Sequence, residues 1–202
     1  MGQGTDPRGT DLNGDGVYEV AALVGSLRQG SYNRGLLRAA QELKPAAMRL
    51  FEVPIGGLPL FNEDLERDGD QPAVRELKAA ILAADAVLVI TPEYNQSVPG
   101  VLKNALDWGS RRYGTASVLK GKPVAMMGAS NGRFGTARSQ LHLRQIFPAL
   151  GMRLLPQPEV YLPNAADAFD AAGVLTDERA RRQIEKLMGS LLDWTERVGG
   201  GI

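Results

Sequence analysis

The stretch that decides the fold is AVLVITPEYNQSVPGVLKNALDW, residues 86–108. It opens with an unbroken apolar run, residues 86–90, which is typical of a strand covered on both faces in a parallel sheet. Pro92 ends this strand, because proline lacks the N–H that a β-ladder needs. After a polar loop, Pro99 and Gly100 open a segment with apolar residues at helical spacing. The stretch therefore predicts a strand, a loop and a helix.

Strand and helix patterns alternate along the rest of the chain. Strands are predicted at residues 20–24, 48–53, 86–90, 123–128 and 154–162, the last interrupted by two prolines. Helices are predicted after the first strand, at residues 72–84 and 100–108, around 143–150, and at 177–198. Pro148 should end or kink the fourth of these helices. Five strands alternating with helices predict an α/β fold, a doubly wound parallel sheet between two helical layers.

Composition sets limits on the partners. The chain has 202 residues, is 44% apolar, and balances 23 basic against 23 acidic residues. A zero net charge gives no electrostatic reason to expect nucleic acid or an anionic membrane as a partner. The chain has no cysteine, which excludes disulfides and thiolate metal sites. With no membrane-length apolar run and no signal peptide, we expect a cytoplasmic protein.

The first seventeen residues are polar and glycine-rich, so residues 1–17 are interpreted as a disordered extension or tag, and residues 18–202 as one domain. Within the extension, Asp11, Asn13 and Asp15 match the opening of a calcium-binding EF-hand loop. The bidentate glutamate required at the twelfth position is replaced by Ala22, inside the first predicted strand. We therefore expect no metal site there.

A small-residue loop follows the first strand and precedes a helix. This arrangement presents free N–H groups and the positive end of a helix dipole to a phosphate. Ser26, Ser31 and Asn33 can donate hydrogen bonds, and Arg28 adds a full positive charge. The alternative is that Ser31 merely caps its helix and Arg28 is solvated. We favour a phosphate site.

The loop after residue 90 carries a recognisable pattern. It reads Pro-Glu-Tyr-Asn at residues 92–95, followed by Ser97, Pro-Gly at 99–100, Leu-Lys-Asn-Ala at 102–105 and Asp-Trp at 107–108. This pattern resembles the NADPH-dependent FMN reductase family, which includes quinone and chromate reductases, and the resemblance extends over roughly residues 18–198. It implies a flavodoxin-like sheet with strand order 2-1-3-4-5, so the loops after the first and third strands would share one crevice.

The resemblance also implies a cofactor site for FMN. The segment with Ser26, Arg28, Ser31 and Asn33 would hold the FMN phosphate. Pro92, Glu93, Tyr94 and Asn95 would line the flavin ring, and a second glycine-rich loop would add Ser130 and Gly132. Glu93 is expected to shape its loop, and the only histidine, His142, is expected to be structural or solvated and not catalytic. No catalytic side chain is expected, because the flavin carries the redox chemistry.

The implied activity is two-electron transfer from NADPH or NADH, through FMN, to a quinone, a free flavin, an azo compound or a metal oxyanion such as chromate. A flavodoxin-type electron carrier and a non-enzymatic regulatory module are the alternatives. Electron carriers of that type are typically acidic, unlike this neutral chain. The family resemblance implies a homodimer or homotetramer, and the apolar loop at residues 54–67 either covers the core or contacts another subunit.

Overall fold

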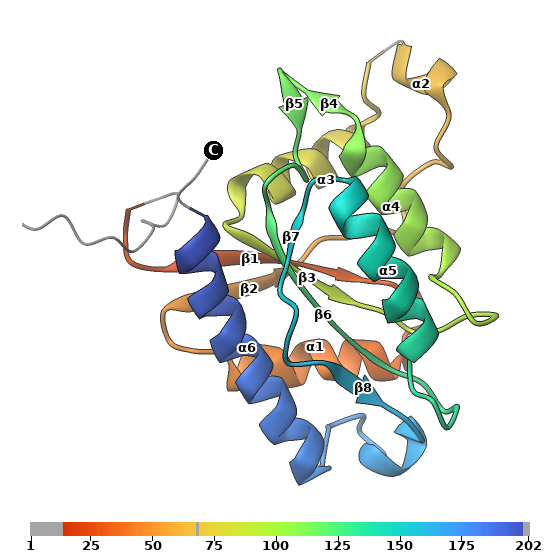
Figure 1. Ribbon diagram of the computed structural model, residues 1–202. Coiled ribbons are helices and arrows are strands. Elements are labelled where there is room, and N and C mark those ends of the chain that lie inside the picture. Colours follow the sequence, from red (N-terminus) through yellow and green to blue (C-terminus); the bar gives the residue numbers. More distant parts are fainter. Residues whose placement is uncertain (1–13, 68, 200–202) are drawn as a thin grey trace, which may run out of the picture.

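The computed structural model describes residues 14–67 and 69–199, and its centre is a parallel sheet (Figure 1). The strand order is β2-β1-β3-β6-β7, and β8 also pairs with β6. Every pairing in this sheet is parallel. The strands are β1 (Tyr18–Val24), β2 (Met48–Glu52), β3 (Ala86–Ile90), β6 (Pro123–Ala129), β7 (Arg153–Leu154) and β8 (Val160–Leu162). The predicted doubly wound sheet is confirmed, and its strand order agrees with 2-1-3-4-5 except that two short strands, β7 and β8, take the fifth position.

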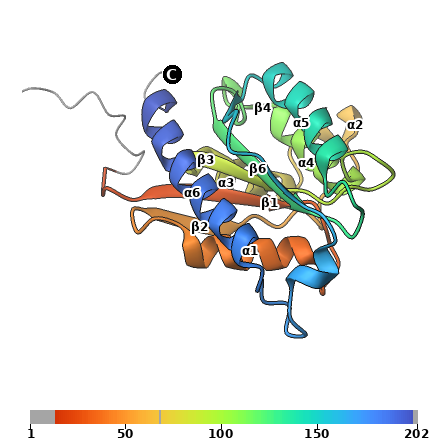
Figure 2. The same ribbon diagram turned by 60° about the horizontal axis from the view of Figure 1, so that its bottom comes forward.

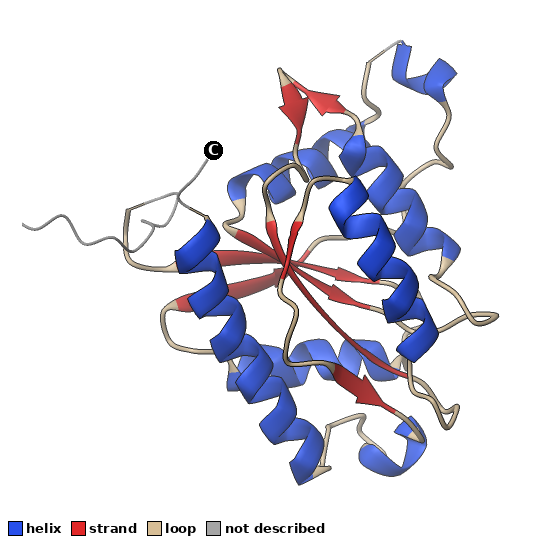
Figure 3. Ribbon diagram, in the orientation of Figure 1, coloured by secondary structure: helices blue, strands red, loops and turns tan. Residues whose placement is uncertain are grey.

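Helices cover both faces of the sheet (Figures 2 and 3). One face is covered by α1 (Tyr32–Leu43) and α6 (Glu178–Val198), which share a core cluster with β1 and β3. The opposite face is covered by α3 (Pro72–Ala83), α4 (Gly100–Ser110) and α5 (Ala137–Ala149). The fold is therefore the predicted three-layer sandwich. None of the helices within the described residues is both long and apolar enough to cross a membrane.

The apolar run of β3 explains how the helical layers on both faces pack against the sheet. Leu88 and Ile90 belong to the core cluster under α1 and α6, whereas Val87 and Val89 belong to the cluster under α3, α4 and α5. The whole strand has no exposed surface. Because successive side chains of a strand point to opposite faces, an uninterrupted apolar sequence is what a doubly covered strand requires.

The fifth strand differs from the prediction of one strand at residues 154–162. Two short strands, β7 and β8, each pair with β6, and Pro156 and Pro158 lie between them. A proline cannot donate to the ladder, so pairing with β6 is lost where the prolines occur and resumes after them. Pro148 lies one residue before the end of α5, as expected of a residue that ends a helix.

Smaller elements extend from the sandwich. They are α2 (Glu63–Arg67), the hairpin of β4 (Arg112–Tyr113) with β5 (Ala116–Ser117), and the short 3-10 helix η1 (Ala165–Ala168). In the apolar loop before α2, Leu58 and Phe61 pack on the core, and Trp108 Nε1 donates a hydrogen bond to the Pro59 carbonyl at 2.8 Å. The apolar side chains of this loop thus partly cover the core, whereas Leu60 is 83% exposed.

Most of the predicted N-terminal extension lies outside the described residues, including Asp11 and Asn13. Two residues that were compared with an EF-hand loop lie within the described residues. Asp15 accepts a hydrogen bond from the backbone N–H of Val17, and Ala22 is buried in β1. The described part of the chain contains no group of three or more His, Cys, Asp or Glu residues that could hold a metal.

Gly128, in β6, provides a test of this packing. A Cβ at this position would collide with the backbone oxygen of Thr91 and lie 2.5 Å from Thr136 Oγ1. Gly128→Ala should lower the free energy of unfolding by about 3 kcal/mol, the upper end for overpacking a core, as measured by urea denaturation. The matched control is Gly189→Ala in α6, where the added Cβ meets nothing within 4 Å and a gain of about 0.5–1 kcal/mol is expected. Equal effects of the two substitutions would contradict the packing described for β6.

Candidate active site

Two loops meet at the carboxyl edge of the sheet because β1 and β3 are neighbours, with Val24 opposite Ile90. The first loop, residues 25–31, follows β1, and the second, residues 91–99, follows β3. A Cβ at Gly25 would lie 3.1 Å from Pro92 Cδ, so a small residue is needed where the loops cross. The Tyr94 hydroxyl donates to Ser26 Oγ at 3.3 Å. The two loops therefore approach each other closely at one edge.

A pocket of about 290 Å³ opens between these loops and the end of β6. Eight of the ten predicted binding residues line it: Ser26, Arg28, Ser31, Asn33, Pro92, Glu93, Tyr94 and Ser130. Two predicted residues, Asn95 and Gly132, are not among its lining residues. Tyr32, Ala129 and Asn131 also line the pocket, although they were not among the predicted binding residues. Each of these three residues is next in the sequence to a predicted binding residue, and this proximity was the one feature of the sequence that could have indicated them.

The N-terminus of α1 forms the electropositive end of the pocket. Ser31 is the N-cap of this helix, and its Oγ accepts a hydrogen bond from the Asn33 N–H at 3.2 Å. The Arg28 guanidinium lies 5.5 Å from the centre of the Tyr32 ring and makes no ion pair with any described residue. A helix N-terminus with a free guanidinium beside it suits an anion such as a phosphate.

Asn33 has a structural task. Its Nδ2 donates to the Ala129 carbonyl at 3.0 Å, and its Oδ1 accepts from the Ala129 N–H at 2.9 Å. The residue is only 3% exposed. The expected phosphate donor is thus a buried link between α1 and the end of β6, and its amide holds the wall of the pocket in place.

The loop after β3 is a tight hairpin. Tyr94 and Ser97 exchange two backbone hydrogen bonds, of 3.1 and 3.0 Å. Between them, Asn95 and Gln96 have φ values of 50° and 64°, in the left-handed region. Asparagine tolerates this region better than most residues, which suits it to the tip. The hairpin leaves the Tyr94 ring half-exposed beside the pocket.

Glu93 anchors this hairpin to α5. Its carboxylate accepts hydrogen bonds from the backbone N–H groups of Arg138 and Ser139, at 2.9 and 3.2 Å, and from Arg138 Nε at 2.8 Å. The N-cap residue of α5, Thr136, makes no side-chain capping bond, so Glu93 satisfies the helix N-terminus in its place. The negative carboxylate closes this second helix N-terminus to other anions.

His142 contributes a further anchor for the hairpin. Its Nδ1 lies 2.9 Å from Ser97 Oγ, and the ring belongs to α5. The residue therefore connects the hairpin to the same helix that Glu93 contacts. The contact helps to hold the hairpin against α5.

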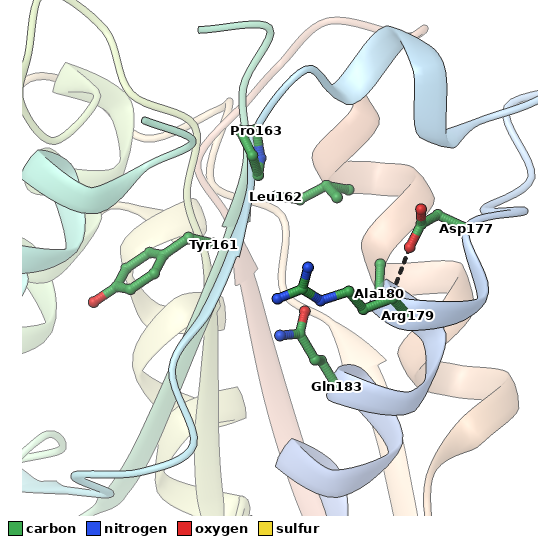
Figure 4. A pocket seen from close by; sticks show the side chains of 7 residues that line it. All are labelled: Tyr161, Leu162, Pro163, Asp177, Arg179, Ala180 and Gln183. Atoms are coloured by element: carbon green, nitrogen blue, oxygen red, sulfur yellow. Dashed lines mark hydrogen bonds between the residues drawn. The ribbon is translucent and has the colours of Figure 1, made fainter. Parts of the chain in front are cut away.

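A second hollow lies between the end of β8 and the start of α6 (Figure 4). There the Asp177 carboxylate accepts from the Ala180 N–H at 2.7 Å, which places a negative charge at the helix N-terminus. Tyr161 points away from Arg179 and Gln183, and burial, with a hydrogen bond to Glu159, raises the pKa of its phenol. This hollow lacks the two converging strand-end loops of the first pocket.

Known proteins share both the sequence and the fold. A sequence model of the NADPH-dependent FMN reductase family matches residues 18–167. An NAD(P)H-dependent FMN reductase of Pseudomonas aeruginosa is 47% identical over 182 residues, which cover 90% of this chain and 97% of the relative. A 2-hydroxy-1,4-benzoquinone reductase of a Burkholderia species is 43% identical over 178 residues, with coverage of 88% and 96%.

Among solved structures, the flavoenzyme NAD(P)H:acceptor oxidoreductase FerB of Paracoccus denitrificans superposes with a TM-score of 0.82 at 40% identity, covering 90% of this chain and 99% of that one. The strand order and the two loops at the carboxyl edge of the sheet agree with this likeness. The chain therefore belongs to the NADPH-dependent FMN reductase family.

Proposed function

We propose that this protein is an FMN-dependent oxidoreductase that transfers two electrons from NAD(P)H to a quinone. The observation that carries the proposal is the pocket that the loops after β1 and β3 form beside Arg28, which makes no ion pair within the described part of the chain. The similar FMN reductase and benzoquinone reductase support the cofactor and the acceptor class. Free flavins, azo compounds and chromate are further candidate acceptors for the same site.

The residues of the pocket fit FMN. Ser26, Ser31 and Arg28 lie at the N-terminus of α1, which is capped by the neutral Ser31 hydroxyl, and would hold the phosphate. The second helix N-terminus is already occupied by the Glu93 carboxylate, so the electrostatics favour one orientation, with the phosphate at α1 and the ring toward the hairpin. Pro92, Tyr94 and the backbone near Asn95 would line the ring.

Bound FMN supplies the two-electron redox chemistry, and the protein supplies binding and orientation. Glu93 and His142 hold the hairpin against α5, so the surface that receives the ring is formed before the cofactor arrives. The half-exposed ring of Tyr94 offers a flat face for stacking against flavin or substrate. No side chain of the pocket has to transfer a proton for these roles.

The alternatives predict different behaviour. An electron carrier would bind FMN without oxidising NAD(P)H, and the zero net charge of the chain speaks against this class. A regulatory module would not take up FMN. The homodimer or homotetramer, the cytoplasmic location, and the division at residue 17 stay predictions.

The purified protein should be yellow, with flavin absorbance that NADPH bleaches anaerobically and that benzoquinone restores. Steady-state NADPH oxidation should depend on added benzoquinone. The expected result follows from a site that binds FMN and leaves its ring accessible to both substrates. A colourless protein that does not take up added FMN contradicts the proposal, and a yellow protein inert to NADPH and NADH favours the electron carrier.

Arg28→Ala should raise the Kd for FMN roughly tenfold to a hundredfold, because one charge-assisted phosphate contact is lost. The Kd is measured by quenching of FMN fluorescence on titration with apoprotein. Arg179→Ala is the matched control, since Arg179 is an exposed arginine that lines the second hollow. A larger increase in Kd for Arg179→Ala than for Arg28→Ala would contradict the proposal, because it would indicate that the phosphate binds in the second hollow.

A further inference from the structure

Positive charge is scarce at the edge of the sheet where the pocket opens. Five described segments follow strands at this edge: residues 25–31, 53–62, 91–99, 130–136 and 163–177. Together they contain only two basic residues, Arg28 and Arg133. Within these five segments, an anionic group therefore has two arginines to contact.

Both arginines are free of ion pairs and lie beside an aromatic ring. Arg28 is next to Tyr32, and the Arg133 guanidinium lies 4.7 Å from the centre of the Phe134 ring. Neither makes an ion pair with another residue in the described ranges. Arg138 also approaches Phe134, at 5.0 Å, but its charge is paired with Glu93 at 2.8 Å. The uncompensated charge at Phe134 is thus that of Arg133.

The position of this second arginine links it to the pocket. Its loop supplies Ser130 and Asn131 to the pocket lining. Phe134 is 51% exposed, an unusual position for a large apolar ring that does not contribute to the core. The loop that lines one side of the pocket therefore also carries a half-exposed aromatic ring with the Arg133 guanidinium beside it.

The two proposed ligands carry separate phosphates, and this inference rests on the proposed function. FMN has one phosphate, which Arg28 and the N-terminus of α1 would hold. NADPH differs from NADH by a phosphate on the adenosine ribose, and an arginine beside a ribose site is a general means of accepting it. We propose that Arg133 binds the adenosine 2′-phosphate of NADPH while Phe134 stacks on the adenine, so that this loop makes the protein selective for NADPH.

The chemistry favours arginine for this role. The planar guanidinium can donate two parallel hydrogen bonds to a phosphate, whereas the 2′-hydroxyl of NADH offers no charge. An exposed aromatic ring stacks on a base irrespective of the nicotinamide end of the molecule. Loss of the Arg133 charge should therefore affect NADPH and leave NADH nearly unchanged.

The test compares Arg133→Ala with the wild-type holoenzyme, using benzoquinone as the acceptor. The KM for NADPH should rise roughly tenfold, while the KM for NADH and both kcat values stay within about twofold. Arg133→Lys should recover part of the NADPH affinity. Arg182→Ala, an exposed arginine on α6, is the control and should change neither KM.

Calorimetric titration with adenosine 2′,5′-bisphosphate gives a readout that does not need turnover. Its Kd should rise at least about fivefold in Arg133→Ala, whereas the Kd of adenosine 5′-monophosphate should not change. Equal losses for NADPH and NADH, or unchanged binding of the bisphosphate, would overturn the inference. A wild-type protein that binds no FMN would show that the proposed function is wrong. This outcome differs from failure of the Arg133 inference, because the bisphosphate titration can still be carried out on that protein.

Discussion

The pocket depends on the parallel pairing of β1 with β3. Their register sets Val24 opposite Ile90, so the chain leaves both strands at the same level of the sheet. The Gly25 N–H donates to the Ile90 carbonyl at 2.8 Å, which extends the pairing into the loops themselves. Parallel neighbours necessarily present their carboxyl ends together, and the crevice between them is where ligands bind in open α/β sheets. The buried apolar residues of β1 and β3 therefore position the site without touching a ligand.

The N-termini of the two helices that begin at this edge differ in their electrostatic environment. The N-terminus of α1 is capped by the neutral Ser31 hydroxyl and lies beside Arg28, which makes no ion pair with any described residue, whereas the N-terminus of α5 is capped by the Glu93 carboxylate. A buried carboxylate that accepts three hydrogen bonds is well compensated, so its cost in the native state is small. An anion can therefore bind at the N-terminus of α1, whereas the Glu93 carboxylate already occupies the N-terminus of α5. A flavin phosphate would thus have a defined place, and the ring a defined direction.

Much of the fold could be predicted from the sequence because the signal is local. The apolar run of β3 and the proline that follows it, Pro92, are contained in a few residues, and they indicate a doubly covered strand that ends before the loop. The division of the last strand was harder: Pro156 and Pro158 were visible, but whether pairing resumed after them depended on β6. The contribution of the two strand-end loops was also predictable. The loop after β1 has the small-residue pattern that often lies between a strand and a helix, and the loop after β3 was indicated by its position at the end of a buried strand and by its family resemblance.

The roles of individual side chains were less accessible, since their partners are distant in the chain. Asn33 bonds Ala129, 96 residues away, and Glu93 bonds the start of α5, 45 residues away. From the sequence, Asn33 was expected to hold phosphate, as its amide can donate hydrogen bonds. Only the tertiary structure reveals that this side-chain amide is hydrogen-bonded to the backbone of β6. Glu93 was expected to shape its loop, and the structure supplies the contacts by which it does so.

A crystal structure of the protein with bound FMN tests the central claim most directly. The account predicts the phosphate within hydrogen-bonding distance of Arg28 and the N-terminus of α1, with the flavin ring against Tyr94. A phosphate found at the start of α5, or in the hollow lined by Arg179 and Gln183, would contradict it.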